Sequence, residues 1–225
     1  AEQKINLALS LLPSEPVLIF AKAELLLETG KFLEAVRLYE NLKEQTDEIA
    51  GVRLSERLAE VYSSGAAYED AIPYYDESLL HHVTPDLLFG LAYAAFQAGE
   101  YDLAVRKLNE VKTLDPDYFS AHLLLSQAYS MLEDNDQAYS AIIEGLSRDE
   151  YDKELYLFAG KMALKLGRTK DAEEHLRQAI VLNPEYMEAT LTLVSVLHSQ
   201  ERNEEVIELV ELISLNQDDW SALYP

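Results

Sequence analysis

One spacing recurs along this chain and restricts the folds that it can adopt. A small residue is followed twelve positions later by a second residue that is usually alanine. The pairs are Ala23/Ala35, Ala59/Ala71, Ala92/Ala104, Ser126/Ala138, Gly160/Ala172 and Val194/Val206. Their second members are 36, 33, 34, 34 and 34 residues apart. A period near 34 is typical of helical solenoids built from repeated hairpins.

Each period is predicted to contain two helices separated by a short turn. The turn residues are Gly30, Gly65, Gly99 and Gly167, with Glu133–Asn135 and Glu201–Asn203 in the other two units. Proline behind a capping residue predicts helix starts at Thr84-Pro85, Asp115-Pro116 and Asn183-Pro184. Pro73 falls inside a predicted second helix, which we expect it to kink or to delay.

The small pairs have a physical reason, because two helix axes approach to about 8–9 Å only where the contact residues are small. The small residue of each first helix is therefore expected to face the alanine of the second. Larger residues such as Tyr39, Tyr62, Tyr75 and Tyr129 would then fill the space toward the next hairpin. A single hairpin cannot bury its own apolar face, so the units must stack.

These residues resemble the tetratricopeptide repeat (TPR) family. Residues 85–118 and 153–186 carry its small–Gly–Ala–Pro skeleton as Ala92, Gly99, Ala104 and Pro116, and as Gly160, Gly167, Ala172 and Pro184. The resemblance implies an all-α, right-handed α-solenoid, an alpha-alpha superhelix of tandem hairpins. The sequence departs from the family where Val194 and Val206 replace small residues, and where Glu44–Val52 exceeds the pattern by about two residues.

We expect one solenoid over 1–225. The predicted repeats are 16–49, 52–84, 85–118, 119–152, 153–186 and 187–219, with 1–13 as the second helix of a truncated repeat and 220–225 as the start of another repeat or a cap. Neither end has a full polar cap, which solenoids need. The chain is therefore interpreted as a fragment of a longer array. The alternative is an array whose end helix is covered by a partner, by a second copy or by Trp220.

Composition excludes several classes of function. The 41 acidic and 18 basic residues give a net charge of −23, which repels nucleic-acid phosphates and anionic membranes. There is no cysteine, and the longest apolar run, Leu87 to Phe96, is too short to span a bilayer. We expect a cytoplasmic protein that needs no metal or cofactor and binds no nucleic acid or membrane.

The family resemblance also implies where partners bind, because the first helices of TPR arrays line a concave groove. By phase, one register of these helices is mostly apolar, and the next turn is mostly polar. The predicted partner-binding residues are Phe20, Glu24, Glu56, Glu60, Phe89, Tyr93, Phe96, Leu123, Gln127, Leu157, Lys161 and Leu191. The family's clamp for acidic tails is absent, since its positions hold Phe20, Glu24, Arg57, Asp86 and Gly90.

The groove is interpreted as a site for an extended peptide or an amphipathic helix. Phe89, Tyr93 and Phe96 would be its anchor, and Glu24, Glu56 and Glu60 would select basic flanks, with Arg53 and Arg57 as alternative counter-ions for Glu56 and Glu60. The competing interpretation is that the apolar register packs inside the array. Residues Leu58 to Val105 lack Lys and Arg, which suggests either a solvated acidic face or attraction for a basic partner.

Signals for an enzyme are poor, because phosphate-loop, H-E-x-x-H and G-x-S-x-G motifs are absent. His81 and His82 are expected at a solvated helix end, and His122 inside a hairpin. The sequence favours a non-catalytic scaffold or adaptor. Two alternatives remain: a homo-oligomer formed through the open solenoid ends, and an interaction module of a longer chain whose catalytic part lies elsewhere.

Overall fold

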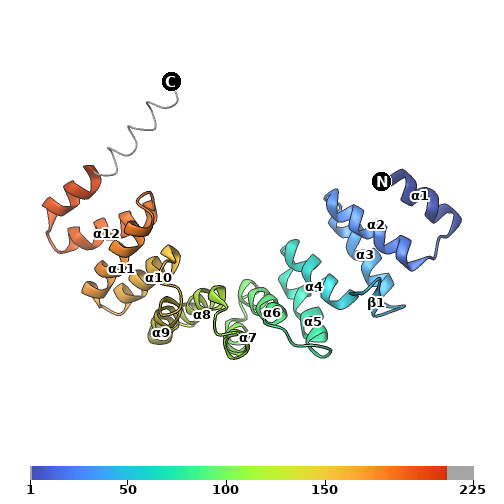
Figure 1. Cartoon of the computed structure of the whole chain (residues 1–225), viewed down its shortest axis with the longest axis horizontal. Coiled ribbons are helices and arrows are strands. Elements are labelled where there is room, and N and C mark those ends of the chain that lie inside the picture. Colours follow the sequence, from blue (N-terminus) through green and yellow to red (C-terminus); the bar gives the residue numbers. More distant parts are fainter. Residues whose placement is uncertain (1, 212–225) are drawn as a thin grey trace, which may run out of the picture. The chain divides into compact units, whose positions relative to one another are not determined.

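A computed structural model describes residues 2–211, and these form two compact units, 2–118 and 119–211 (Figure 1). The first unit contains α1 (Glu2–Leu11), α2 (Pro16–Glu28), α3 (Phe32–Lys43), β1 (Glu48–Ile49), β2 (Val52–Arg53), α4 (Leu54–Ser64), α5 (Tyr68–Leu79), α6 (Pro85–Gln97) and α7 (Tyr101–Leu114). The second contains α8 (Phe119–Met131), α9 (Asn135–Leu146), α10 (Lys153–Lys165), α11 (Thr169–Leu182) and α12 (Met187–Ser199), followed by helical residues 203–211.

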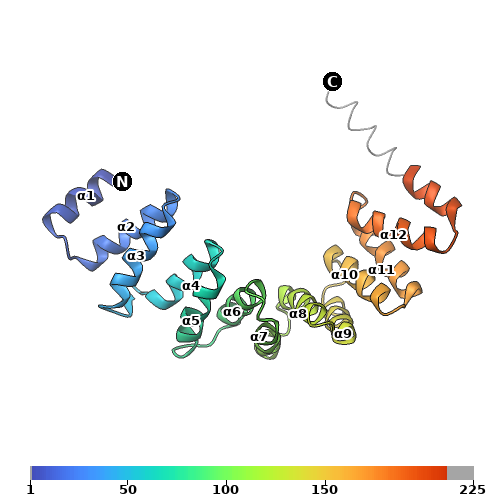
Figure 2. The same cartoon turned by 180° about the vertical axis from the view of Figure 1, so that it is seen from behind.

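Consecutive helices pair as antiparallel hairpins within each unit. The pairs α2/α3, α4/α5 and α6/α7 lie side by side in the first unit, and α8/α9 and α10/α11 in the second (Figures 1 and 2). The expected all-α solenoid fold of tandem helical hairpins is thus confirmed. The repeat limits remain predictions, and Trp220–Pro225 lies outside the described residues.

The small pairs lie where the two helices of a hairpin touch. Ala71, Ala104, Ala138 and Ala172 are all completely buried, as the phase requires. Gly160 illustrates how close the helices come, because a Cβ added there would lie 2.8 Å from Cγ of Leu176 on α11. The phase of the repeat is therefore correct.

The last hairpin is joined differently. Val194 and Val206 are only half-buried, and charged side chains link α11 to helical residues 203–211. Glu173 accepts hydrogen bonds from Arg202 at 2.6 Å and from Arg177 at 2.8 Å, and Glu205 binds the same two arginines. Arg202 lowers the pKa of the Glu173 carboxyl, and Arg177 adds to this effect against partial burial. An ion network therefore joins α11 to the second helix of the last hairpin.

The predicted turns are confirmed, and most contain a residue in the left-handed region. Gly30, Gly99 and Gly167 have φ of 75°, 83° and 70°, which glycine adopts without strain. Glu133 and Glu201 adopt the same conformation, with φ of 62° and 60°. A residue with a Cβ is less stable there, so these two glutamates store strain.

Two of the three predicted proline helix starts are wrong. Thr84 caps α6 as expected, its hydroxyl accepting a hydrogen bond from the Leu87 amide at 3.2 Å. Asp115 and Asn183 instead accept from amides two residues ahead, at 3.1 Å each, and α8 and α12 begin three residues after the prolines. Each proline therefore lies in a turn before its helix.

Pro73 does not delay its helix, because α5 begins five residues earlier at Tyr68 and runs continuously to Leu79. The expectation of a delayed start is therefore wrong. Two residues further along α5, the side chain of Tyr75 contacts the next hairpin, as predicted. Its ring is 7% exposed and lies so close to Gly90 of α6 that a Cβ added at Gly90 would be 2.7 Å from Cε1 of Tyr75.

The extra residues between α3 and α4 form a small antiparallel hairpin. Glu48 pairs with Arg53 and Ile49 with Val52, across a turn in which Ala50 and Gly51 both have positive φ. Such two-residue turns match the twist of paired strands. Ile49 is buried in the core of the first unit, so the strands are anchored beside the start of α4.

Candidate functional site

A charged cleft of about 490 Å³ lies where β1–β2 meets the first two turns of α4. Its lining residues are Glu48, Gly51, Val52, Arg53, Glu56, Arg57, Glu60 and His82. Glu56 and Glu60 are two of the predicted partner-binding residues, and the strand pair that walls the cleft is an addition to the repeat pattern. The cleft therefore combines first-helix side chains with a feature particular to this chain.

Arg57 neutralises a second predicted carboxylate, Glu24. Its Nε and Nη2 bind the two oxygens of Glu24 at 2.8 and 2.7 Å, and its Nη1 binds Glu60 at 3.0 Å. Tyr39 donates to Glu24 at 2.6 Å and packs edge-on against the half-buried Phe20, with ring centroids 5.6 Å apart. Partial burial opposes the charged form of Glu24, but Arg57 and Tyr39 outweigh it and lower the pKa of this carboxyl. Glu24 thus already has a counter-ion.

Glu56 is bound more loosely. One of its oxygens lies 3.5 Å from Nε2 of His82, in the loop after α5. Arg53, the expected counter-ion, forms no ion pair within residues 2–211, so that assignment is wrong for Arg53 and right for Arg57 with Glu60. Of the charged side chains that line the cleft, those of Glu48 and Arg53 form no ion pair within residues 2–211, and that of Glu56 has only the contact with His82.

The three predicted aromatic anchors do not form one open patch. Phe89 packs on Tyr118, Tyr93 on Tyr68 and Phe96 on Tyr101, with ring centroids 5.0, 5.9 and 5.5 Å apart. Phe89 and Phe96 are half-buried, whereas Tyr93 is 38% exposed. Tyr93 is thus the most accessible of the three.

The tyrosines that pack on these anchors were not among the predicted site residues. Tyr68 and Tyr101 are each the first residue of a second helix, α5 and α7. This shared position was a signal, because aligning the repeats places both tyrosines at the same step of the period.

The first helices of the second unit present a smaller surface than expected. Leu157 is 2% exposed and packs in a core cluster with Leu176 and Leu193, so its proposed role as a groove residue is corrected. Leu157 lies on the face of α10 that packs against α11 and α12. Leu191 is 57% exposed. Leu123 and Gln127 are half-buried.

Lys161 is already engaged by neighbouring side chains. It pairs with Glu188 at 2.5 Å and lies 5.5 Å from the centre of the Phe158 ring. Lys165, one turn on, donates to Ser130 at 2.6 Å. In the second unit, Leu191 is therefore an exposed apolar residue of the predicted set, whereas Lys161 and Lys165 already have partners within the protein.

Two histidines lie partly or wholly inside the second unit. His122 is completely buried, as predicted, and its Cβ lies close to Gly145. His175 lies between Tyr139 and Tyr156, and the Tyr139 hydroxyl lies 3.1 Å from its Nε2. Burial lowers the pKa of His175, against the opposing effect of nearby carboxylates. Among residues 2–211, no three His, Asp or Glu side chains are placed to share a metal ion.

Comparison with known proteins identifies the family. TPR models match residues 57–119 and 89–153, and a further TPR model matches 163–224. A model described as YpiA-like tetratricopeptide repeats matches residues 1–47. The chain belongs to the tetratricopeptide repeat family. None of the described helices of this TPR chain has the length and hydropathy required to cross a membrane.

Individual relatives and solved structures also support this family and fold. The chain is 38% identical over 220 residues to the TPR repeat-containing protein YpiA of Bacillus subtilis (strain 168), covering 97% of this chain and 52% of YpiA. It thus spans about half the length of that relative. Solved structures of MamA and of YrrB superpose with TM-scores of 0.67 and 0.66 at 17% and 19% identity. They cover 74% and 88% of this TPR chain, and 98% and 97% of MamA and YrrB.

Proposed function

We propose that this TPR chain is a non-catalytic scaffold that holds an apolar peptide or helical segment of a partner protein, with basic flanking residues, on its first-helix face. The fold is that of protein-interaction scaffolds, and YrrB is described as a TPR protein with an unusual peptide-binding site. The observation that carries the proposal is the charged cleft beside α4, because it is a concave site formed partly by predicted partner-binding residues.

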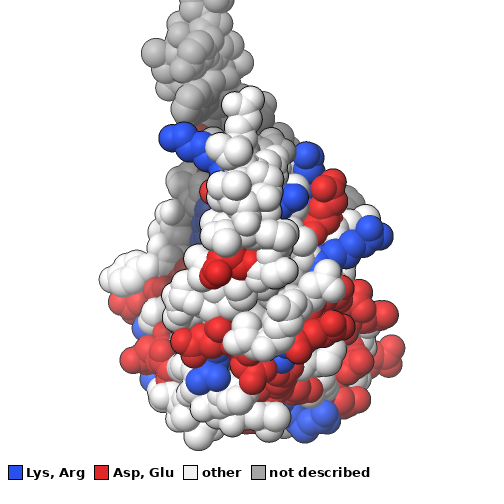
Figure 3. Space-filling view, turned by 90° about the vertical axis from the view of Figure 1, so that its right-hand side faces the viewer, with Lys and Arg blue, Asp and Glu red and all other residues white. Residues whose placement is uncertain are grey.

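The charge of the cleft supports a partner segment with basic flanking residues. Once Arg57 is assigned to Glu24 and Glu60, the carboxylates of Glu48 and Glu56 face the cleft with Arg53 and His82 as the remaining cationic neighbours. Viewed from the α1 side, Asp and Glu side chains gather over the lower part of the molecule, with fewer cations among them (Figure 3). Such a surface attracts basic segments and accelerates their association at low salt.

The exposure of Tyr93 supports an apolar contact with the same partner segment. It occupies the same position of its repeat as Glu60 does in the preceding repeat, and it presents part of its ring to solvent while Tyr68 supports it edge-on. Exposed tyrosines with a fixed orientation lose little entropy on binding and are enriched at interfaces. We therefore assign the main anchor to Tyr93 rather than to the half-buried Phe89 and Phe96.

The test compares two double variants as bait in affinity capture from a native lysate. Tyr93→Ala with Glu56→Gln should lose a set of proteins that the unmodified chain retains, and the retained peptides should be apolar with Lys or Arg flanks. The matched control is Tyr151→Ala with Glu150→Gln, because Tyr151 is 74% exposed on a loop of the second unit. If both variants retain the same proteins as the unmodified chain, the first-helix face is not the binding site.

One observation favours self-assembly as the second candidate. On α1, Leu7 and Leu11 are 66% and 75% exposed and lie one turn apart, so they form an apolar stripe. Light scattering over a dilution series decides between the candidates. A mass that rises with concentration and returns to that of a monomer in Leu7→Ser with Leu11→Ser would support self-assembly.

A further inference from the structure

A second hollow lies in the first unit, and none of its lining residues lines the charged cleft. It measures about 380 Å³ and is lined by Val83, Leu88, Arg106, Asn109, Glu110, Thr113 and Leu114. Leu88 is 1% exposed and belongs to its floor, whereas Val83 and Leu114 are 57% and 54% exposed at its edge. Water therefore contacts large apolar side chains around a concavity, an arrangement that marks interaction sites.

Most polar groups of the rim already have partners. The Asn109 amide donates to the carbonyl of Val105 at 2.9 Å, and the Thr113 hydroxyl donates to the carbonyl of Asn109 at 2.8 Å. Glu110 accepts from Lys107 at 3.1 Å. These bonds all lie within α7.

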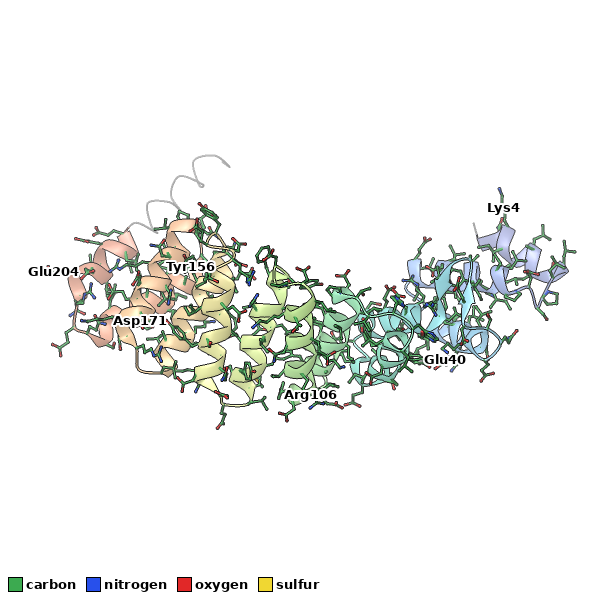
Figure 4. The ribbon with its side chains drawn as sticks, turned by 60° about the horizontal axis from the view of Figure 1, so that its bottom comes forward. Lys4, Glu40, Arg106, Tyr156, Asp171 and Glu204 are labelled. Carbon is green, nitrogen blue, oxygen red and sulfur yellow. The ribbon has the colours of Figure 1, made fainter. Side chains whose placement is uncertain are left out.

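Arg106 is the exception. Its side chain is exposed and has no hydrogen bond or ion pair within the part of the chain that the structure describes. Figure 4 labels it at the lower side of the view, on α7. A guanidinium that is not engaged by the protein can bind a carboxylate through two parallel hydrogen bonds.

The charge around the hollow differs from that of the whole chain. Helix α7 carries three cations, Arg106, Lys107 and Lys112, and two carboxylates, Asp102 and Glu110, although the chain as a whole has a net charge of −23. The lining itself carries one cation, Arg106, and one carboxylate, Glu110. Because Glu110 is paired with Lys107, Arg106 is the charged group of the lining that a ligand can engage.

Helix geometry sets the spacing that an occupant needs. Arg106 and Leu114 are eight residues apart on α7, which is about 12 Å along the axis. An extended peptide advances about 3.3 Å per residue, so about four residues cover this distance.

We propose that this hollow docks a short segment of another protein in which an Asp or Glu lies about four residues from a large apolar residue. The apolar side chain sits between Val83 and Leu114, and the carboxylate binds Arg106. This surface shares no lining residue with the charged cleft and selects the opposite charge, so the two surfaces take different partner segments.

The probe is a displayed library of random 12-residue peptides, panned against the unmodified chain and three variants. Selected peptides should share an acidic residue three to five positions from Leu, Ile, Phe or Trp. Leu114→Asp should weaken their binding at least tenfold by fluorescence anisotropy. Arg106→Glu should do the same, and repeated panning on it should select Lys or Arg in place of the acidic residue.

The matched control is Arg37→Glu. Arg37 is exposed and occupies in repeat 16–49 the position that Arg106 occupies in repeat 85–118, and it lines none of the described hollows. Peptide binding should be unchanged in this variant, and thermal melts should show that all three variants remain folded.

Three results would overturn the proposal: no enriched pattern, equal binding of the selected peptides to Arg106→Glu, or a dimer that Leu114→Asp dissociates. The last would assign the hollow to a second copy of the chain.

Discussion

Gly90 provides a direct test of how neighbouring hairpins are joined in the first unit. Replacing a glycine by alanine inside a helix ordinarily stabilises it by about 1 kcal/mol. Here the added Cβ would lie 2.7 and 2.8 Å from Cε1 and Cζ of Tyr75, well inside the contact distance of carbon atoms, about 3.5–4.0 Å. The ring cannot retreat easily, because it is 7% exposed and packs in the core between α4, α5 and α6.

Overpacking of this kind costs about 1–3 kcal/mol. The clash therefore outweighs the gain in helix propensity, and Gly90→Ala should lower the free energy of unfolding by about 1 kcal/mol. In a Tyr75→Leu background the ring is absent, so the same substitution should raise it by about 1 kcal/mol. The double-mutant cycle should then give a coupling of about 2 kcal/mol between the two positions.

The assay is urea unfolding of the four proteins, followed by far-ultraviolet circular dichroism with the slope m compared across the set. The effect of Gly90→Ala on the free energy of unfolding must change sign between the two backgrounds. An equal effect in both would show that Tyr75 does not restrict Gly90, and that the packing of α5 on α6 is looser than described.

Three further predictions concern the helical turns, the hairpin contact and pH. Glu133→Gly should raise the free energy of unfolding by about 1 kcal/mol in urea melts, because glycine adopts the positive φ of that turn without strain. Ala104→Leu should cost about 1–3 kcal/mol, since Ala104 is completely buried, and a neutral thermal melt would contradict the close approach of α6 and α7. Burial lowers the pKa of His175, so the folded chain binds fewer protons there than the unfolded chain and loses stability as the pH falls below about 6.5. His175→Gln should show a smaller loss of urea midpoint between about pH 7 and 5, and identical losses would exclude this histidine as a contributor.

The repeat period was enough to predict the hairpins, because it reports where backbones approach closely. Ala71 and Ala104 are buried where the period places them. The path of a turn depends on hydrogen bonds that a period does not specify. Asp115-Pro116 and Thr84-Pro85 look alike in sequence, yet Thr84 bonds three residues ahead and caps a helix, whereas Asp115 bonds two residues ahead and forms a turn.

It was harder to predict which residues of the first-helix face are exposed. Leu157 and Leu191 share a register, but Leu157 is buried by neighbouring helices while Leu191 is exposed. Glu24 and Arg57 are 33 residues apart, so their pairing depends on how two hairpins stack rather than on either helix. Tertiary packing thus decides which first-helix side chains a partner can reach.

The ion network between α11 and helical residues 203–211 has a consequence for handling the protein. Raising the ionic strength from 0.1 M to 1 M shortens the Debye length from about 10 to 3 Å, which weakens contacts such as those of Glu173 and Glu205 with Arg202. The buried methyl groups of Ala138 and Ala172 do not respond in this way. Concentrated electrolyte should therefore loosen this helix first, and limited proteolysis would then begin there while the hairpins before it stay intact.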